Sequence, residues 1–264
     1  MNPDAIKKFA GTTNGHALPG GQNESVRAGN LVLKPIHETE KYLWMAKCLN
    51  KIDFEDLQIA IPVRSRDGNY TEDSIGATRY YEATFLPNRL ETKLDTCHRL
   101  NKMIANVSKP DGFDSWENRW TKAQGVAWSQ SGRTNMEVPE EIKMLLEMRT
   151  PLERPQQLVH VDLAGNILFD RYDNAVVIDF TPGFYPKEYA EVLLLIDSIA
   201  WYGASIENLN LLKLEEELKN QLILRALIFR LCVPLFRESA NENKDYQTNF
   251  DGYRGVIGKV NRGS

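Results

Sequence analysis

The stretch from Leu158 to Phe180 constrains the fold more than any other part of the sequence. It contains two short, largely apolar runs, at residues 166–169 and 175–178, on either side of the turn-like segment Asp-Arg-Tyr-Asp-Asn. Two strand-length runs around a turn of this composition predict a β-hairpin. Polar side chains beside such a hairpin are held close together, so they are the first place to look for chemistry.

Four polar residues flank this predicted hairpin: His160, Asp162, Asn166 and Asp179. Phosphoryl transfer needs a carboxylate that orients the acceptor hydroxyl and oxygen ligands that hold Mg²⁺ against the phosphates. Asp162, Asn166 and Asp179 offer those groups. Each fragment alone is commonplace, since Asp-Phe after apolar residues usually marks a strand that runs into a turn. Their order and close spacing favour a phosphotransfer site.

The order His-Val-Asp, then Asn, then Asp-Phe resembles the catalytic loop and metal motif of the protein-kinase-like superfamily, and especially its aminoglycoside phosphotransferase branch. The resemblance implies an ATP- and Mg²⁺-dependent phosphotransferase. By this resemblance, Asp162 would be the catalytic base, Asn166 and Asp179 would be the metal ligands, and His160 would brace the loop. The resemblance also implies a bilobal α+β fold with a small antiparallel-sheet lobe and a mainly helical lobe.

The catalytic loop departs from the family pattern in its length. The family usually places the Asn five residues after the catalytic Asp, whereas only Leu163-Ala164-Gly165 separate Asp162 from Asn166. Gly165 gives the backbone freedom to compensate. This shorter form is similar to that of uncharacterised actinobacterial members of the superfamily. It also favours a second hypothesis, a catalytically inactive pseudokinase that binds a nucleotide or a partner, although the retained Asp162, Asn166 and Asp179 oppose it.

The N-terminal part contains the residues that the resemblance assigns to nucleotide binding. They are Gly20, Gly21, Ser25, Lys34, Glu40 and Tyr81. Glycines let a backbone approach phosphates closely, and Lys34 ends an apolar strand where the family places its phosphate-binding lysine. A surface lysine at a strand end is the alternative for Lys34. Glu38 is the alternative to Glu40 as its partner. Both acids lie near the start of a helix predicted over residues 38–49, where the helix dipole alone favours acidic side chains.

Apolar periodicity predicts the remaining elements. Helices are expected at residues 3–10, 89–105, 188–203, 213–236 and 250–260, and strands at 57–63, 69–71 and 74–81. The helix over residues 89–105 is inferred from the apolar stripe Leu90, Leu94, Cys97, Leu100 and Ile104. We therefore expect a nucleotide-binding lobe over residues 1–81 and a helical lobe over residues 82–264.

Composition limits the classes of function. The net charge of −4 and the pI near 5.7 argue against a general binder of nucleic acids or anionic membranes. Cys48, Cys97 and Cys232 lack the spacing of a zinc site or a disulfide framework. The N-terminus has no apolar core of a signal peptide, so a cytoplasmic protein is expected.

A small molecule is favoured as the acceptor, because no long segment ending in Ala-Pro-Glu follows Asp179. The sequence leaves open the identity of the acceptor, the choice between ATP and GTP, and the oligomeric state.

Overall fold

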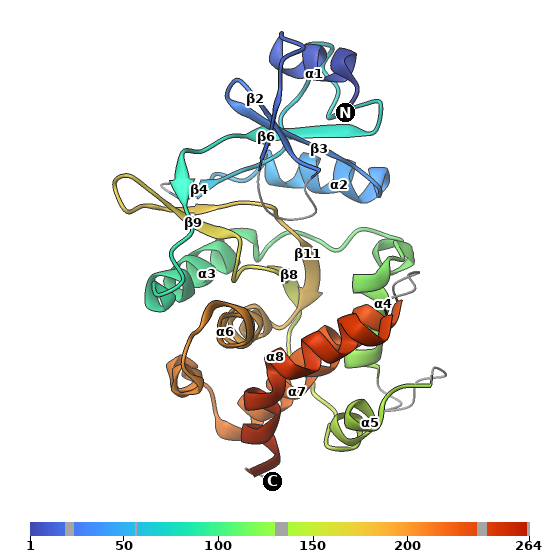
Figure 1. The fold of residues 1–264 in the computed structure, drawn as a ribbon, viewed down its shortest axis with the longest axis vertical. Coiled ribbons are helices and arrows are strands. Elements are labelled where there is room, and N and C mark those ends of the chain that lie inside the picture. Colours follow the sequence, from blue (N-terminus) through green and yellow to red (C-terminus); the bar gives the residue numbers. More distant parts are fainter. Residues whose placement is uncertain (19–23, 56, 130–136, 237–241, 263–264) are drawn as a thin grey trace.

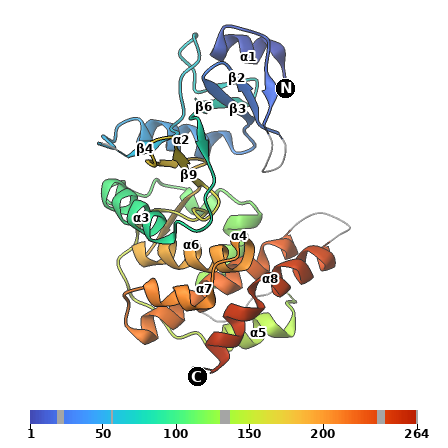
Figure 2. The same cartoon turned by 60° about the vertical axis from the view of Figure 1, so that its left-hand side comes forward.

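In a computed structural model, the chain folds into a small lobe of strands and helices above a larger, mainly helical lobe (Figures 1 and 2). The structure describes residues 1–18, 24–55, 57–129, 137–236 and 242–262. The predicted α+β architecture with two lobes is confirmed. Within the described residues, no helix is both long and apolar enough to span a membrane.

The small sheet and its helices come first along the chain, and most of the helices follow. The first part of the chain forms α1 (Pro3–Ala10), β1 (His16–Ala17), β2 (Val26–Ala28), β3 (Leu31–Pro35), α2 (Thr39–Leu49), β4 (Gln58–Ile59), β5 (Thr71–Glu72) and β6 (Ile75–Arg79). The second part forms β7 (Ala83–Thr84), α3 (Leu90–Ile104), η1 (Phe113–Ser115), α4 (Arg119–Trp128), α5 (Glu140–Glu147), β8 (Gln157–His160), β9 (Ile167–Asp170), β10 (Ala175–Val177), β11 (Pro182–Tyr185), α6 (Lys187–Tyr202), η2 (Ile206–Leu211), α7 (Glu216–Cys232), η3 (Pro234–Phe236) and α8 (Glu242–Arg262).

The sheet of the small lobe has the strand order β1-β2-β3-β6-β5, with every pair antiparallel. Leu33 and Ala77 form a cross-strand pair and pack against α1, whereas a Cβ on Gly76 would collide with the Tyr42 ring of α2. Because side chains alternate across a strand, Lys34, which pairs with Gly76, points to the face that carries α2. The lysine thus faces away from α1.

The prediction of a strand over residues 57–63 in the small sheet is wrong. Only β4 forms there, and it pairs in parallel with β10 of the hairpin. Pro62 has no amide hydrogen and cannot continue a ladder, and it makes only an isolated bridge to Thr78. The result is a second sheet, β4-β10-β9-β7, that joins strands from both lobes.

The hairpin predicted from the central stretch is confirmed as β9 and β10, paired at Phe169 with Ala175. Its turn is closed by Asp170, whose Oδ1 accepts hydrogen bonds from the amides of Tyr172 and Asn174. Asp173 adopts the left-handed conformation there, with φ of 68°. The neighbouring pair β8 and β11 is antiparallel and places His160 opposite Pro182.

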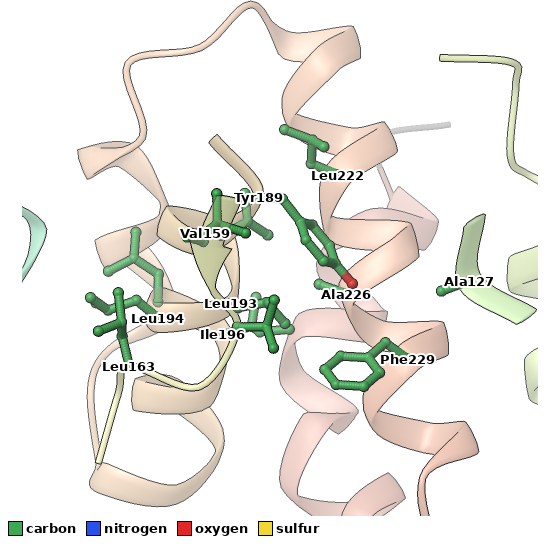
Figure 3. Packing of buried hydrophobic residues seen from close by; sticks show 14 of the residues in the cluster. Ala127, Val159, Leu163, Tyr189, Leu193, Leu194, Ile196, Leu222, Ala226 and Phe229 are labelled. Atoms are coloured by element: carbon green, nitrogen blue, oxygen red, sulfur yellow. The ribbon is translucent and has the colours of Figure 1, made fainter. Parts of the chain in front are cut away.

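The core of the helical lobe lies between α6 and α7, where Tyr189, Leu193 and Phe229 are fully buried (Figure 3). The Tyr189 hydroxyl donates to Gln124 Oε1 of α4 at 3.0 Å, so the ring's polar end is satisfied. The final helix, α8, is longer than the predicted 250–260. It packs on α6 and α7, and its residues Asn249 and Tyr253 line one cavity together with Asp162.

Candidate active site

His160 ends β8 and holds the catalytic loop from inside the protein. Its side chain is fully buried. Nδ1 accepts a hydrogen bond from the Asp162 amide at 3.1 Å, so Nε2 carries the proton and donates to the Ile178 carbonyl at 3.3 Å. Burial lowers the pKa of His160 to about 4, and the ring is therefore neutral at pH 7. These contacts join the catalytic loop to the end of β10.

Asn166 lies beside Asp162 despite the shorter interval between them. Asn166 Nδ2 donates to the Asp162 carbonyl at 2.7 Å and approaches Asp162 Oδ2 at 3.3 Å. The Asn166 carbonyl accepts from the Ile178 amide at 2.9 Å, one residue before Asp179. The structure therefore brings Asp162, Asn166 and the backbone before Asp179 together.

Asp179 and Lys34 meet across the two lobes, although 145 positions separate them. Lys34 Nζ bonds to Asp179 Oδ1. Asp179 has a positive φ of 53°, a conformation that is uncommon outside glycine and often occurs at functional sites. Burial lowers the pKa of Lys34 to about 8. The adjacent carboxylate favours the charged ammonium, and because Lys34 is still 35% exposed we treat the pair as ionised.

Two side-chain oxygen atoms of the candidate site, one on Asn166 and one on Asp179, are available to a metal ion. Among the described residues, neither Asn166 Oδ1 nor Asp179 Oδ2 accepts a hydrogen bond. Mg²⁺ usually takes one or two protein ligands and completes its shell with water and phosphate oxygens. The described residues contain no cluster of three or more His, Cys, Asp or Glu side chains that would hold a metal without a ligand's help. The donor set thus fits Mg²⁺ bound together with a nucleotide.

The structure does not bring Glu40 to Lys34. Glu40 is exposed in the first turn of α2, and no ion pair joins it to Lys34 within the described residues. Glu38 turns toward the helical lobe instead, where its Oε2 accepts from Asn118 Nδ2 at 2.7 Å. Acids at this helix start are explained by the helix dipole, and the cofactor role of Glu40 stays a prediction.

The other predicted nucleotide-binding residues are placed as follows. Gly20 and Gly21 lie outside the described residues. Ser25 precedes β2, and its carbonyl accepts from the Leu18 amide at 2.9 Å. Tyr81 lies in the segment between β6 and β7, and its hydroxyl donates to the Ile59 carbonyl at 3.3 Å. Nucleotide contacts by these residues remain predictions.

Arg230, on α7, belongs to the site and was not found by sequence reasoning. Its Nη2 donates to Asp162 Oδ1 at 3.0 Å and to the Val161 carbonyl at 3.2 Å. Its guanidinium also pairs with both oxygens of buried Asp197, one of which accepts from the Tyr253 hydroxyl at 2.6 Å. Burial opposes the charge on Arg230, but the two carboxylates outweigh burial and raise its pKa. A charged residue inside an apolar helix was the available signal.

A cavity of about 180 Å³ opens beside Asp162. Asp162, Asp197 and Arg230 form its polar side, and its aromatic side is formed by Trp120, Trp201, Tyr202 and Tyr253. Asp162 is 43% exposed, so its carboxylate reaches this space although Arg230 and Asn166 hold it. A larger pocket of about 490 Å³ shares Tyr202 with it but contains neither Asp162 nor Asn166. The smaller cavity is therefore the candidate site.

Comparison of the whole chain with known proteins gives structural matches only. No protein-family model matches it, and no curated protein matches its sequence. The structure is similar to choline kinase LicA from Streptococcus pneumoniae, with a TM-score of 0.57 and 14% identity over 92% of this chain and 93% of the other. The chain has the protein-kinase-like fold.

Two further solved structures agree with this fold. One is spectinomycin phosphotransferase APH(9)-Ia in complex with ADP and spectinomycin, with a TM-score of 0.56 and 12% identity over 93% of this chain and 91% of the other. The other is the GDP complex of aminoglycoside 2'-phosphotransferase-IIIa, with a TM-score of 0.54 and 12% identity over 92% and 93% of the two chains. At such low identity the likeness establishes the fold, as the resemblance implied. Similarity to actinobacterial members stays a prediction.

Proposed function

We propose that the chain is an ATP- and Mg²⁺-dependent phosphotransferase that acts on a hydroxyl group of a small molecule. Many functions share one fold, so the proposal rests on the site rather than on the likeness to kinases. The observation that carries the proposal is the environment of the Asp162 carboxylate. Its carboxylate lines a cavity while Arg230 and Asn166 contact one oxygen each.

Asp162 acts as the base in this proposal. Arg230 occupies Oδ1 with a bond of 3.0 Å, whereas the contact of Asn166 with Oδ2 is longer, at 3.3 Å. Oδ2 is therefore the oxygen that accepts the proton of the acceptor hydroxyl. A carboxylate fixed at one oxygen is already oriented, and orientation is a large part of catalysis in phosphoryl transfer.

The nucleotide side of the site is formed by Lys34, Asn166 and Asp179. Mg²⁺, when bound with the nucleotide, supplies neutralisation of phosphate charge. Asn166 Oδ1 and Asp179 Oδ2 are the oxygens that would hold it. Lys34 would exchange its bond to Asp179 for the phosphates, which is an exchange of one anionic partner for another.

The acceptor is inferred to be small. The cavity beside Asp162 measures about 180 Å³, and β11 leads into α6 at Lys187 without a long segment that could present a protein substrate. Proteins of this fold include a choline kinase and a spectinomycin phosphotransferase, and their named substrates are reasonable first tests. We further infer from the net charge of −4 that the protein has no general nucleic-acid or anionic-membrane partner.

A pseudokinase is the second candidate, and one observation favours it. Lys34 bonds directly to Asp179, so two of the ligand-binding groups occupy each other. Such a protein would bind a nucleotide or a partner without transfer. The two candidates differ at Asp162, which only an enzyme requires.

The test compares Asp162→Asn with Asp179→Asn. Asp162→Asn should keep Mg²⁺-ATP binding and lose activity by about 10²–10⁴-fold, the usual contribution of a general base. Asp179→Asn should lose both binding and activity. Calorimetry with Mg²⁺ or with EDTA measures binding, and slow ATP hydrolysis stands in for transfer until an acceptor is found among small alcohols. Asp95→Asn, at an exposed position of α3, is the matched control.

Unchanged hydrolysis in Asp162→Asn, together with lost nucleotide binding in Asp179→Asn, would identify a pseudokinase. Absence of metal-dependent nucleotide binding in the parent protein at millimolar concentrations would contradict the phosphotransferase and would leave only a pseudokinase that binds a partner.

A further inference from the structure

Lys93, on α3, is a fully buried lysine beside the catalytic loop. Its side chain has 0% exposure. Its ammonium donates to the Ala164 carbonyl at 3.1 Å and lies 4.1 Å from the centre of the Phe85 ring. Within the described residues it forms no ion pair with a carboxylate. The buried charge is therefore stabilised by a backbone carbonyl of the catalytic loop and by aromatic rings.

Such an arrangement is energetically unfavourable, so we expect the buried ammonium to have a function. Burial of an ammonium without an ionic partner costs free energy, and the cost is visible in the pKa of Lys93, which burial lowers to about 8. Cation–π contact with Phe85 offsets part of it. A Met or Leu at this position would fill the same space without a charge. The donor group, rather than the packing, is what distinguishes Lys93 from those residues.

The carbonyl that Lys93 holds lies at the centre of a tight turn. The Asn166 amide donates to the Leu163 carbonyl at 2.9 Å, which closes a four-residue turn with Ala164 and Gly165 in the middle. The two common turn types differ by a flip of the central peptide, here the one that contains the Ala164 carbonyl. A glycine at the third position makes both types accessible, because it tolerates the positive φ of type II.

In the structure, the central peptide of this turn has the orientation that needs no positive φ at Gly165. Gly165 is not among the described glycines with positive φ, so the turn is not type II. Lys93 contacts the Ala164 carbonyl in this orientation. A Cβ on Gly165 would collide with the Tyr202 hydroxyl, and the Tyr202 ring centre lies 5.9 Å from the Lys93 ammonium. The central peptide thus contacts side chains of both α3 and α6.

We propose that Lys93 is a positioning residue that selects this turn conformation and so makes the shortened interval between Asp162 and Asn166 compatible with catalysis. The proposal rests on the phosphotransferase function above. Its physical basis is the chain of contacts from Lys93 to the Ala164 carbonyl, through the turn to Asn166, and from Asn166 Nδ2 to Asp162. Without the Lys93 hydrogen bond the Ala164 carbonyl loses its contact with α3, so the turn and the Asn166 backbone that follows it would be less restrained.

The test replaces Lys93 with Met, which is similar in length and lacks the donor. The protein should fold, because an apolar side chain replaces a buried charge. Mg²⁺-ATP binding should stay within about 3-fold, because Lys34 and Asp179 are untouched, whereas kcat for ATP hydrolysis should fall about 10- to 100-fold, the scale of a misplacement near 1 Å. Lys102→Met, at an exposed position of the same helix, is the control and should match the parent.

A second readout does not depend on activity. The side-chain amide signal of Asn166 in NMR, assigned through its loss in Asn166→Asp, should move in Lys93→Met and stay in Lys102→Met. Lys93→Gln keeps a donor on a shorter side chain and should lose less of kcat than Lys93→Met. An Asn166 signal that does not move in Lys93→Met, or a Gln variant that is as slow as the Met variant, would overturn the proposal.

Failure of the proposed function is distinguishable from failure of this inference. If the parent protein hydrolyses no ATP and transfers no phosphate, the phosphotransferase is rejected. The Asn166 signal in Lys93→Met then decides alone whether Lys93 selects the turn.

Discussion

The two sides of the site are held in different ways. On the acceptor side, Asp162 is restrained through its amide by His160 and through its carboxylate by Arg230 and Asn166. On the nucleotide side, the Lys34 ammonium bonds among the described residues to Asp179 alone, and both side chains are partly exposed. Redundant buried bonds fix a geometry, whereas one exposed pair is easily exchanged.

This difference matches what each side has to do. The base must be oriented before the acceptor arrives, since orientation lowers the barrier only if it exists in advance. The lysine must leave its present partner when phosphates bind. Variants that break one side at a time should therefore give different effects, large on stability for the acceptor side and small for the nucleotide side.

The largest effect on stability is expected from Arg230→Met. The change leaves buried Asp197 without its ionic partner, and breaking a buried pair in this way costs about 3–5 kcal/mol. The free energy of unfolding from urea titration measures the effect. Arg254→Met breaks an exposed pair with Asp251 and should cost at most about 1 kcal/mol.

A second variant separates loss of the pair from loss of packing. Arg230→Met combined with Asp197→Leu removes both charges and should recover much of the stability, since apolar replacements of a whole buried pair are often neutral. A double variant as unstable as Arg230→Met would show that the ionic pair is not what stabilises this side.

The next effect concerns pH and His160. Its folded-state pKa of about 4 lies below its ordinary 6.5, so as pH falls from 6.5 to 4 the unfolded chain takes up a proton before the folded one. Stability contributed by the neutral ring is present above pH 6.5 and is lost across that window, by up to about 3 kcal/mol. The difference in unfolding free energy between the parent and His160→Gln should shrink accordingly. His16→Gln, on an exposed strand, is the matched control.

The sequence predicts part of the acceptor side of the site. It predicts hardly any of the distant residues that hold Asp162 in place. The spacing of His160, Asp162 and Asn166 was enough to predict that they lie together, because all three are near one another along the chain. The partner of Asp162 was not predictable in the same way, since Arg230 is 68 positions away. Only its place in an apolar helix marked it as a residue that needs a partner.

Lys93 and β4 show two other limits. Lys93 lies three positions after Leu90 and four before Cys97, so the apolar stripe of α3 already placed it on the buried face, but periodicity does not say which carbonyl it meets. The pairing of β4 with β10 joins residues more than a hundred positions apart, and a two-residue strand carries no pattern that predicts a partner. Local sequence patterns do not determine which distant strands pair with each other.

The smallest effect on stability is expected from Lys34→Ala. The pair with Asp179 is partly exposed, and such pairs contribute about 0–1 kcal/mol, so the free energy of unfolding should change little. Mg²⁺-ATP affinity should nevertheless fall by about 10-fold or more, since a charge-assisted contact with phosphate contributes about 1.5–3 kcal/mol. Lys47→Ala, at an exposed position of α2, should change neither quantity. Equal nucleotide affinity in Lys34→Ala and the parent would make Lys34 an ordinary surface lysine, and a large loss of stability would mean that the nucleotide side is as firmly built as the acceptor side.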